Sequence, residues 1–468
     1  MIYHNLYDRC KGKTVTAGII GTGHFGTAVI IQALNNRMLN VPILADKNLE
    51  AARLAFQRAH IPDEKIVECT TALQAATALK EGRYVITSNV MMMMELPVDV
   101  IVESTGNAEA GAVHGLAAIQ SGKHLVMVNK ETDSCVGPIL NALAKEKGVV
   151  YTPIDGDQHG LLMQMVEWAR DTGLEVICAG KTRDAEFIYN RKDRTLRVES
   201  DGGITISETV TVQLKDEDIP YIEELPDRKQ LEYLKRRKEI AEKLDGCGGF
   251  DLCEMVIAAN AVGLKPDVPE MNDEILRIPE IPKVLCEKKN GGILKESGIV
   301  DVVTCLREEH EAGMGGGVFM VVRCENEYSQ MIISTKGCLS NSDGSVSLIY
   351  RPYHLCGVEA PTTLLCAGLL EVATGSRRYF QDYDLVQTAD TDLSAGEILG
   401  NDHDRKLKAK IIPASLVGAE NPVPAHMLSG KRLIRDVKKG EMITYEMIEE
   451  PEQSVLWALR KKQDLMER

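Results

Sequence analysis

A glycine-rich stretch near the N-terminus constrains the fold more than any other part of the chain. An apolar run at residues 15–20 leads into Gly21, Gly23 and Gly26, and the residues after Gly26 repeat at helical period. In a strand, tight turn and helix with this G-x-G-x-x-G spacing, free backbone N–H groups and the positive end of the helix face a pyrophosphate. A second apolar run ends at Asp46, about twenty residues further on, where a carboxylate that binds a ribose is expected. The stretch therefore predicts a dinucleotide-binding unit.

Composition and charge narrow the choice of partners. The chain has 468 residues, which is long for a single hydrophobic core, so we expect two or three domains. Its net charge of −15 and the lack of a basic patch argue against nucleic acid or an anionic membrane surface as the main partner. The first residues have no apolar core, and no uncharged run approaches the ~18 residues of a membrane span, so we expect a cytoplasmic protein. The twelve cysteines contain no C-x-x-C pair, which indicates neither a disulfide framework nor a structural zinc site.

Strand-like runs alternate with amphipathic helix-like segments between residues 15 and 153. This alternation is typical of a doubly wound parallel sheet, so the predicted fold class is α/β with a Rossmann domain. After the first unit, the predicted strands lie at residues 41–46, 84–87, 98–105, 124–129 and 149–153. The predicted helices lie at residues 49–60, 107–121 and 137–147.

Polar residues follow two of these strands. The sequence Glu-Ser-Thr-Gly occupies residues 103–106, and Asn-Lys-Glu occupies residues 129–131. Ligands of open α/β sheets bind outside the carboxyl ends of the strands, so both clusters should line the cofactor cleft. Lys130 is either a solvated loop charge or a donor to a substrate oxygen. The predicted cofactor-binding residues are Gly21, Gly23, His24, Phe25, Gly26, Asp46, Ser104, Thr105, Gly106 and Asn129.

Two carboxylates separated by one residue, Asp155 and Asp157, open the second region together with His159. Two such oxygen ligands suit a hard cation such as Mg²⁺ or Mn²⁺. Asp157 also precedes a helix-like segment, so a role as helix N-cap is an equally good reading.

The middle of the chain contains several less specific patterns. Residues 204–214 alternate like a half-exposed strand, and the charged residues 215–243 read as a solvated helical insertion. Residues 249–269 predict a helix with a glycine stop. The glycines at 313–317 lack the Lys-Ser/Thr of a P-loop and read as a turn. Further on, His354 could protonate a substrate oxygen or bind a phosphate together with Arg351, or it could be a structural histidine.

A near repeat marks the C-terminal part. The pattern D-x-x-x-G-E occurs at residues 392–397 and again at 436–441, and each copy reads as a glycine-closed turn between short strands. We therefore expect a small β-rich module, followed by a terminal helix.

These motifs carry a family resemblance over nearly the whole chain. The order GIIGTGHFG, VIVESTG, MVNKE resembles homoserine dehydrogenases, and VNKETDS with TPIDGDQH is similar to the NKES and VDSEH segments of 1-deoxy-D-xylulose 5-phosphate reductoisomerase. The D-x-x-x-G-E steps resemble a SAF domain. Taken together, the chain resembles homoserine-dehydrogenase-like oxidoreductases with a C-terminal SAF domain, which include reductoisomerase-like enzymes.

The resemblance implies a set of roles and boundaries. It makes Lys130 the catalytic lysine and places Lys181, in an A-G-K step, in the active site. It implies metal binding by the carboxylate pair, although the SAF-bearing relatives usually have alanine where Asp155 stands. It also implies that residues 360–363 return to the cofactor domain. The expected domains are a Rossmann domain at 1–153, a substrate domain at 154–386, a SAF domain at 387–450 and a terminal helix at 451–468.

The expected function is NAD(P)-dependent hydride transfer to or from a small anionic polyol, sugar or hydroxy-acid derivative. Reductoisomerase-like activity, homoserine oxidation and a non-catalytic NAD(P)-binding sensor are the alternatives. Asp46 favours NAD, whereas Lys47 and Arg53 could accept the 2′-phosphate of NADP, and the resemblance makes a homo-oligomer the expectation. The predicted catalytic residues are Lys130, Asp155, Asp157, Lys181 and His354. The predicted substrate-binding residues are Lys181, Arg351 and His354, and the predicted metal ligands are Asp155 and Asp157.

Overall fold

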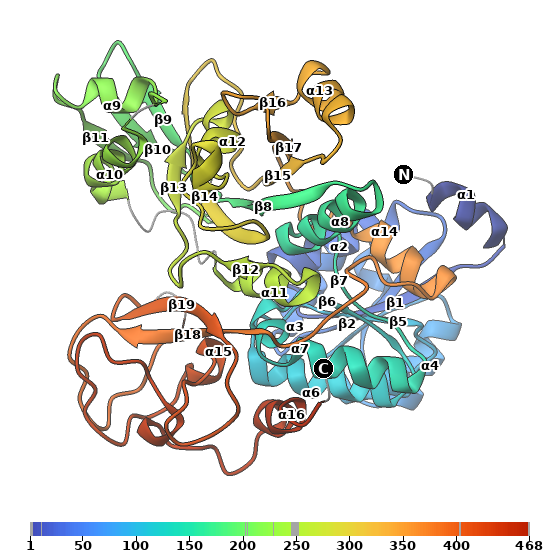
Figure 1. The fold of residues 1–468 in the computed structure, drawn as a ribbon. Coiled ribbons are helices and arrows are strands. Elements are labelled where there is room, and N and C mark those ends of the chain that lie inside the picture. Colours follow the sequence, from blue (N-terminus) through green and yellow to red (C-terminus); the bar gives the residue numbers. More distant parts are fainter. Residues whose placement is uncertain are drawn as a thin grey trace. The chain divides into compact units, whose positions relative to one another are not determined.

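The computed structural model describes residues 3–10, 12–201, 203, 205–227, 229–244, 252–401 and 404–466 (Figure 1). Its contacts divide the chain into two compact units. The first unit consists of residues 1–160, 355–406 and 414–468, and the second of residues 161–354 and 407–413. Each is described by itself below.

A seven-stranded sheet forms the centre of the first unit, with the strand order β3-β4-β2-β1-β5-β6-β7 and every neighbouring pair parallel. This confirms the predicted doubly wound α/β sheet. The strands are β1 (Val15–Ile20), β2 (Leu39–Ala45), β3 (Ile66–Glu68), β4 (Tyr84–Thr87), β5 (Val100–Glu103), β6 (His124–Met127) and β7 (Tyr151–Pro153). The helices among them are α2 (His24–Leu34), α3 (Leu49–Arg58), α4 (Ala72–Lys80), α5 (Val90–Met94), α6 (Ala108–Gln120) and α7 (Lys130–Lys147).

The core of this unit also receives a segment from much later in the chain. The short helix α14 (Ala360–Leu365) buries Ala360, Leu364 and Leu365 in the same apolar cluster as Val15 of β1. A helix of the first unit therefore follows nearly two hundred residues of the second. The N-terminal helix α1 (Tyr3–Tyr7) contacts α14, because the Tyr7 hydroxyl donates to the carbonyl of Thr362 at 3.3 Å.

The start of α7 differs from the prediction of a helix at 137–147. The helix begins seven residues earlier, at Lys130, and Asn129 is its N-cap. The Asn129 side-chain oxygen accepts a hydrogen bond from the backbone N–H of Thr132 at 3.1 Å, which satisfies a donor of the first turn. Lys130 is therefore the first residue of a helix and does not lie in a loop.

A mixed sheet forms the second unit, with the order β11-β10-β9-β14-β8-β15-β17-β16, and β12 and β13 also pair with β14. Its strands are β8 (Glu175–Thr182), β9 (Phe187–Asn190), β10 (Thr195–Val198), β11 (Val210–Gln213), β12 (Lys265–Pro266), β13 (Glu274–Leu276), β14 (Ile299–Glu308), β15 (Val318–Arg323), β16 (Leu339–Ser340) and β17 (Ser347–Arg351). Its helices are α9 (Ile219–Glu223), α10 (Gln230–Ile240), α11 (Leu252–Val262), α12 (Ile281–Val284) and α13 (Glu327–Thr335). Helix α8 (Gln158–Asp171) starts at the end of the first unit and continues into the second.

Two predictions for the second unit need correction. The strand predicted at 204–214 is confined to β11. The Asp201 carboxylate accepts hydrogen bonds from the N–H groups of Thr205 and Ile206, so the residues before β11 bend into a loop. Residue 204 lies outside the described part.

The insertion at 215–243 is not fully solvated. Arg237 is completely buried and binds Glu280 through both terminal nitrogens, at 2.6 and 3.0 Å. Of the helix predicted at 249–269, the structure shows α11, and residues 249–251 lie outside the described part.

The two copies of the C-terminal repeat bind one another. Asp392 accepts from the backbone N–H of Lys439 at 2.9 Å, and Asp436 accepts from that of Ala395 at 2.8 Å. Leu393 and Val437 form an antiparallel bridge between these contacts. Each repeat thus supplies an aspartate to the other in the same way. The turns belong to a β-rich module of the first unit that includes β18 (Tyr383–Ala389) and the short helix α15 (Ala425–Leu428), whereas β19 (Leu407–Pro413) belongs to the second unit.

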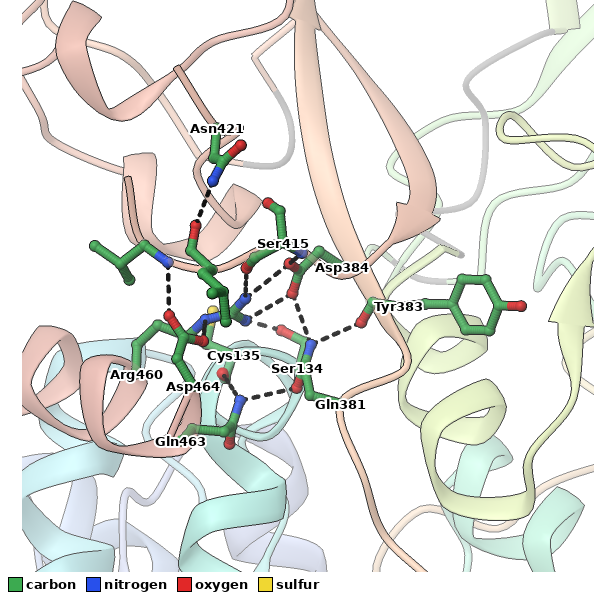
Figure 2. A network of polar contacts seen from close by, with 12 residues as sticks. Ser134, Cys135, Gln381, Tyr383, Asp384, Ser415, Asn421, Arg460, Gln463 and Asp464 are labelled. Carbon is green, nitrogen blue, oxygen red and sulfur yellow. Dashed lines mark hydrogen bonds and ion pairs between the residues drawn. The ribbon is translucent and has the colours of Figure 1, made fainter. Parts of the chain in front are cut away.

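The C-terminal helix α16 (Val455–Gln463) is fixed to the first unit by a buried polar network (Figure 2). Arg460 and Asp384 are each 1% exposed at the side chain and form a bidentate pair at 2.6 and 2.8 Å. Arg460 also donates to the carbonyl of Ser415 at 2.8 Å. Among the helices of the described residues, we find none with the length and apolar character needed to cross a membrane.

Candidate functional site

The glycine loop between β1 and α2 has one open position and two crowded ones. Gly21 has φ +89°, and a Cβ there would lie 2.7 Å from the Ser104 carbonyl oxygen. A Cβ on Gly26 would lie 2.1 Å from the Gly21 carbonyl oxygen. At Gly23, by contrast, no heavy atom lies within 4 Å of the added Cβ, and no side chain caps the first turn of α2, which starts at His24. The loop therefore leaves space and free N–H groups at Gly23, where a pyrophosphate would approach.

Asp46 lies directly after β2 and is bound to the glycine loop. Its Oδ2 accepts from both the backbone N–H and the hydroxyl of Thr22, each at 2.7 Å, and its Oδ1 accepts from Asn48 N–H at 2.8 Å. Arg53, a candidate for a 2′-phosphate, instead binds Asp63 at 2.8 Å. These contacts orient the Asp46 carboxylate beside the loop, in the place where a ribose hydroxyl would bind.

The residue that follows β5, Ser104, also contacts the glycine loop. The Ser104 hydroxyl lies within hydrogen-bond distance of the carbonyls of Ile20 and Gly21, at 2.9 and 2.8 Å. The fully buried Glu103 accepts from the hydroxyl of Thr105 at 2.7 Å and from the side-chain amide of Asn129 at 2.8 Å. Glu103 thus joins the ends of β5 and β6 and orders the loop that carries the predicted cofactor-binding residues through Gly106.

Glu103 belongs to the cluster predicted to line the cofactor cleft, but neither it nor its neighbour His114 was predicted as a binding or catalytic residue. His114 Nδ1 lies 3.1 Å from Glu103 Oε1. The signal for Glu103 was available, since a carboxylate that ends an apolar strand needs buried partners. Asn129 is predicted to bind cofactor, but it is only 1% exposed. Its side-chain amide donates to Glu103 and Thr105, and its side-chain oxygen accepts from the N–H of Thr132 in the first turn of α7.

Lys130 and Asp157 face one another in the first unit. The Lys130 Nζ lies 3.8 Å from Asp157 Oδ1, and the lysine side chain is 32% exposed while the aspartate is 5% exposed. His159 Nδ1 lies 3.5 Å from the same oxygen, and His159 is buried. Asp157 also accepts from the N–H of Gln158, the first residue of α8, at 2.8 Å. A buried carboxylate thus holds a partly exposed ammonium in place.

The second carboxylate of the predicted pair, Asp155, is also buried. Its backbone N–H donates to the hydroxyl of Thr363 in α14 at 2.8 Å, so the return of α14 fixes this turn. Among the described residues, the structure shows no group of three or more His, Cys, Asp or Glu side chains arranged to hold a metal ion. The role of Asp155 and Asp157 as metal ligands stays a prediction.

Asp133, one turn after Lys130 on α7, is a buried acid that the sequence reasoning missed. Its Oδ1 accepts from the hydroxyls of Tyr151 and Tyr379 at 2.5 and 2.7 Å. Burial raises the pKa of the Asp133 carboxyl, against the opposing effect of His159. Because the predicted helix begins only at residue 137, nothing in the sequence pattern indicated that Asp133 points into the core.

The second unit contains the other predicted site residues. Lys181, in β8, lies with its Nζ 3.5 Å from Glu254 Oε1 of α11, and both side chains are buried. Lys181 and Arg351 both pair with Val318 of β15, so the two cations lie at one level of the sheet, two strands apart and on the same face. Glu254 lies in a helix of mostly apolar residues, and no pattern in the sequence marked it as a partner of Lys181.

His354 and the glycine-rich turn are close together in this unit. His354 Nδ1 lies 2.6 Å from the Gly316 carbonyl oxygen, and the Arg351 guanidinium lies 4.7 Å from the centre of the Tyr353 ring. Glu186 accepts from the N–H of Gly315 at 2.8 Å and from that of Met314. A side chain of the protein itself therefore binds the N–H groups of this turn, as expected for a structural turn.

Comparison with known proteins connects this chain with oxidoreductases. The family model described as "Oxidoreductase DRL, catalytic domain" matches residues 230–360. The 1-deoxy-D-xylulose 5-phosphate reductoisomerase of Leptospira biflexa is 36% identical over 76 residues, which cover 16% of this chain and 19% of that protein. The enzyme of the same name from Leptospira borgpetersenii is 31% identical over 158 residues, covering 32% of this chain and 40% of that protein. The chain thus matches between a fifth and two fifths of the length of these relatives.

Solved structures give weaker likenesses. A structure of 1-deoxy-D-xylulose 5-phosphate reductoisomerase from Zymomonas mobilis in complex with NADPH has a TM-score of 0.29 at 16% identity, covering 53% of this chain and 58% of that one. A myo-inositol dehydrogenase from Lactobacillus casei in complex with NAD(H) and myo-inositol has a TM-score of 0.27 at 14% identity, covering 38% and 47%. The family model and the sequence relatives together relate this chain to oxidoreductases, 1-deoxy-D-xylulose 5-phosphate reductoisomerases among them.

Proposed function

We propose that this chain is an NAD(P)-dependent oxidoreductase that transfers hydride to or from the carbon of an alcohol or carbonyl group in a small anionic molecule. The observation that carries the proposal is the glycine loop. Ser104 and Asp46 hold it from both sides, and the position at Gly23 is open. The matching family model, which describes an oxidoreductase catalytic domain, supports the same class of reaction.

The residues of the first unit fit a dinucleotide. The N–H groups at Gly23 and His24 would hold the pyrophosphate, Asp46 the adenosine ribose, and the loop at Thr105 and Gly106 the nicotinamide half. When bound, the nicotinamide supplies or accepts the hydride.

Lys130 is the proposed catalytic residue. Asp157, 3.8 Å from its ammonium, keeps the positive charge in place at the partly exposed end of α7. A lysine held in this way donates a hydrogen bond to the reacting oxygen and polarises the carbonyl, or transfers a proton to it as the alkoxide forms. Lys181, Arg351 and His354 of the second unit would bind the anionic group of the substrate.

Reductoisomerase-like activity on 1-deoxy-D-xylulose 5-phosphate is the second candidate, because the curated relatives carry that name. In that reaction Asp155 and Asp157 would hold Mg²⁺ or Mn²⁺, whose charge would stabilise oxygen atoms of the substrate. The resemblance of the C-terminal module to a SAF domain and the likeness to homoserine dehydrogenases stay predictions.

Titration of the purified chain with NADH and NADPH, followed by fluorescence, tests the proposal. The variant Gly23→Ala adds a methyl group where the protein leaves open space, so the fold should be unchanged and cofactor binding should be lost. Unchanged thermal unfolding of this variant is the control. Failure of the wild-type chain to bind either dinucleotide would overturn the proposal.

A second measurement separates the two candidates. Nicotinamide absorbance is followed after addition of 1-deoxy-D-xylulose 5-phosphate, with and without Mn²⁺. Oxidation of NADPH that needs both 1-deoxy-D-xylulose 5-phosphate and Mn²⁺ supports reductoisomerase activity. Cofactor binding without turnover of this compound favours another anionic polyol or hydroxy acid as the substrate. Binding that leads to no turnover with any such compound would support the non-catalytic sensor.

A further inference from the structure

A pocket of about 170 Å³ in the first unit is bounded by the loop after β5, the start of α7 and the β-rich C-terminal module. Gly106 lines it from the loop, and Glu131 lines it from the first turn of α7. Lys431 lines it from the module, and Trp457 lines it from α16. Gly106 belongs to the loop assigned above to the nicotinamide half of the dinucleotide, so the pocket adjoins that part of the proposed cofactor site.

Contacts within the protein hold the walls of this pocket together. His426 of α15 also lines the pocket, and its Nδ1 lies 2.8 Å from the Ser134 hydroxyl oxygen of α7. On another side, Glu109 of α6 accepts from the backbone N–H of Val455, the first residue of α16, at 2.7 Å. The module and α16 are therefore fixed to the helices that flank the proposed cofactor site.

Four titratable side chains line the pocket, namely Glu109, Glu131, His426 and Lys431. Glu109 and His426 take part in the contacts that fix the walls. Within the part of the chain that the structure describes, no ion pair or hydrogen bond involves the side chains of Glu131 and Lys431. The pocket thus offers one carboxylate and one ammonium to a ligand. This balance favours a neutral group that donates hydrogen bonds at one end and accepts them at the other.

Trp457 adds a second donor to the lining. The residue is 4% exposed, and its buried indole N–H has no acceptor among the described residues. Its ring packs edge-on against Tyr445, with 5.4 Å between the ring centres. A buried N–H without an acceptor is rare in proteins, because it costs the free energy of a lost hydrogen bond. A ligand oxygen in the pocket would supply the acceptor.

We propose that this pocket binds the carboxamide group of the nicotinamide. The carboxamide oxygen accepts from Lys431 and Trp457, and the carboxamide NH₂ donates to Glu131. A primary carboxamide is neutral and planar, with an acceptor at one end and two donors at the other, which matches these three groups. A Cβ on Gly106 would lie 4.0 Å from Glu131 Oε1, so the carboxylate stands beside the loop assigned to the nicotinamide. The inference rests on the proposed function and adds the C-terminal module to the cofactor site.

Contacts at both ends of the carboxamide would prevent rotation of the nicotinamide ring about its bond to the ribose. The carbon that carries the hydride would then keep one position relative to the substrate. Orientation of this kind lowers the barrier of a reaction between bound groups. The module would therefore contribute to turnover as well as to affinity.

Calorimetric titration of the full-length chain with NADH, its 3-acetylpyridine analogue and ADP-ribose tests the inference. The analogue has a methyl group where the carboxamide has NH₂, so it cannot donate to Glu131. The wild-type chain should bind NADH about tenfold more tightly than the analogue, because a hydrogen bond to a charged group is lost. Glu131→Ala should bind the two with nearly equal dissociation constants. If the wild-type chain prefers NADPH, the 2′-phosphorylated forms of all three ligands are used.

Two variants test the donors of the module and of α16. Lys431→Met removes the ammonium, and Trp457→Phe removes the N–H but keeps an aromatic ring. Each should weaken NADH binding about threefold to tenfold and leave ADP-ribose binding unchanged, because ADP-ribose has no nicotinamide. Lys439→Met, at a 69% exposed lysine of the same module, is the matched control. Thermal unfolding checks the fold, and Lys431→Met decides alone where Trp457→Phe does not fold.

The outcomes separate this inference from the proposed function. Equal affinity of the wild-type chain for NADH and the analogue would overturn the inference and leave the proposed function in place. Unchanged NADH binding in Lys431→Met, or an equal weakening of ADP-ribose binding, would do the same. A wild-type chain that binds no dinucleotide would instead overturn the proposed function, and the inference with it.

Discussion

The side-chain amide of Gln463 replaces a backbone hydrogen bond of α7 at Ile139. Its Oε1 accepts from the Ile139 N–H at 2.9 Å, and its Nε2 donates to the Cys135 carbonyl at 3.0 Å. In an uninterrupted α-helix these two backbone groups bond to each other. Pro138 lies between them and disturbs this turn, so the C-terminal helix completes the helix that carries Lys130.

Gln463→Ala should lower the free energy of unfolding by about 2–4 kcal/mol, because it leaves the buried N–H of Ile139 and carbonyl of Cys135 without this partner. Urea unfolding measures the change. Lys461→Ala removes an exposed side chain from the same helix, together with its surface ion pair to Glu450, and should cost less than ~1 kcal/mol. Equal losses in the two variants would show that the amide does not complete α7.

The buried pair of Arg460 and Asp384 should show strong coupling. Arg460→Met leaves the Asp384 carboxylate buried without its cation, which costs about 3–5 kcal/mol. Asp384→Asn leaves the guanidinium in the same position, and the double variant should lose clearly less than the sum of the two single losses. Additive losses in a double-mutant cycle would contradict a direct interaction between the two charges.

Asp301 should make stability depend on pH. The residue is fully buried in β14, and burial raises its pKa to about 7, although Asn272 donates to its carboxyl through both the backbone and the side chain. The folded-state pKa lies above the ordinary value of about 3.9, so the stabilising contribution is complete below about pH 4 and is lost as the pH rises through 7.

Asp301→Asn should remove this dependence. Between pH 4 and 7 the unfolding free energy of the wild-type chain should fall more steeply than that of the variant, by up to about 1.4 kcal/mol per pH unit. Urea unfolding in a series of buffers provides the comparison. Parallel pH profiles would mean that the carboxyl titrates at its ordinary pKa.

The elements that were predicted correctly from the sequence are those determined by residues close together in the chain. The parallel sheet and the glycine loop follow from strand and helix periodicity and from the steric need for glycine at positions 21 and 26. The start of α7 was missed because its first turns are polar and Pro138 resembles a residue of a first helical turn. The three-residue strand β3 is too short to show alternation.

Contacts between distant segments explain the rest. Gln463 meets Cys135 across 328 positions of sequence, and Arg237 meets Glu280 across 43. Glu254 and Asp133 appear as site neighbours only when tertiary packing brings α11 to Lys181 and the Tyr379 hydroxyl to α7. No local sequence pattern predicts such packing, so the two buried acids of the candidate site became apparent only in the structure.

Lys130→Ala should reduce turnover by at least about a hundredfold, since general acid catalysis commonly contributes a factor of 10² to 10⁴. Dinucleotide binding should be unchanged, because the lysine side chain is held by Asp157. Steady-state rates with the substrate found by the absorbance assay, together with NADH and NADPH titrations, measure both quantities. Lys145→Ala, at the exposed end of the same helix, is the control. A rate near that of the wild type would remove Lys130 from the mechanism.

Asp46 should set the preference for the dinucleotide. Its carboxylate is held beside the glycine loop by Thr22 and Asn48. There it would accept from a ribose 2′-hydroxyl and repel a 2′-phosphate, so NADH should bind more tightly than NADPH. Asp46→Asn removes the negative charge and should shift the ratio of the two dissociation constants toward NADPH by about tenfold or more. Because Arg53 is bound to Asp63, Arg53→Ala should leave that ratio unchanged. An NADPH preference in the wild-type chain that depends on Arg53 would show that the acid turns away from the ribose and that the guanidinium leaves Asp63 to bind the phosphate.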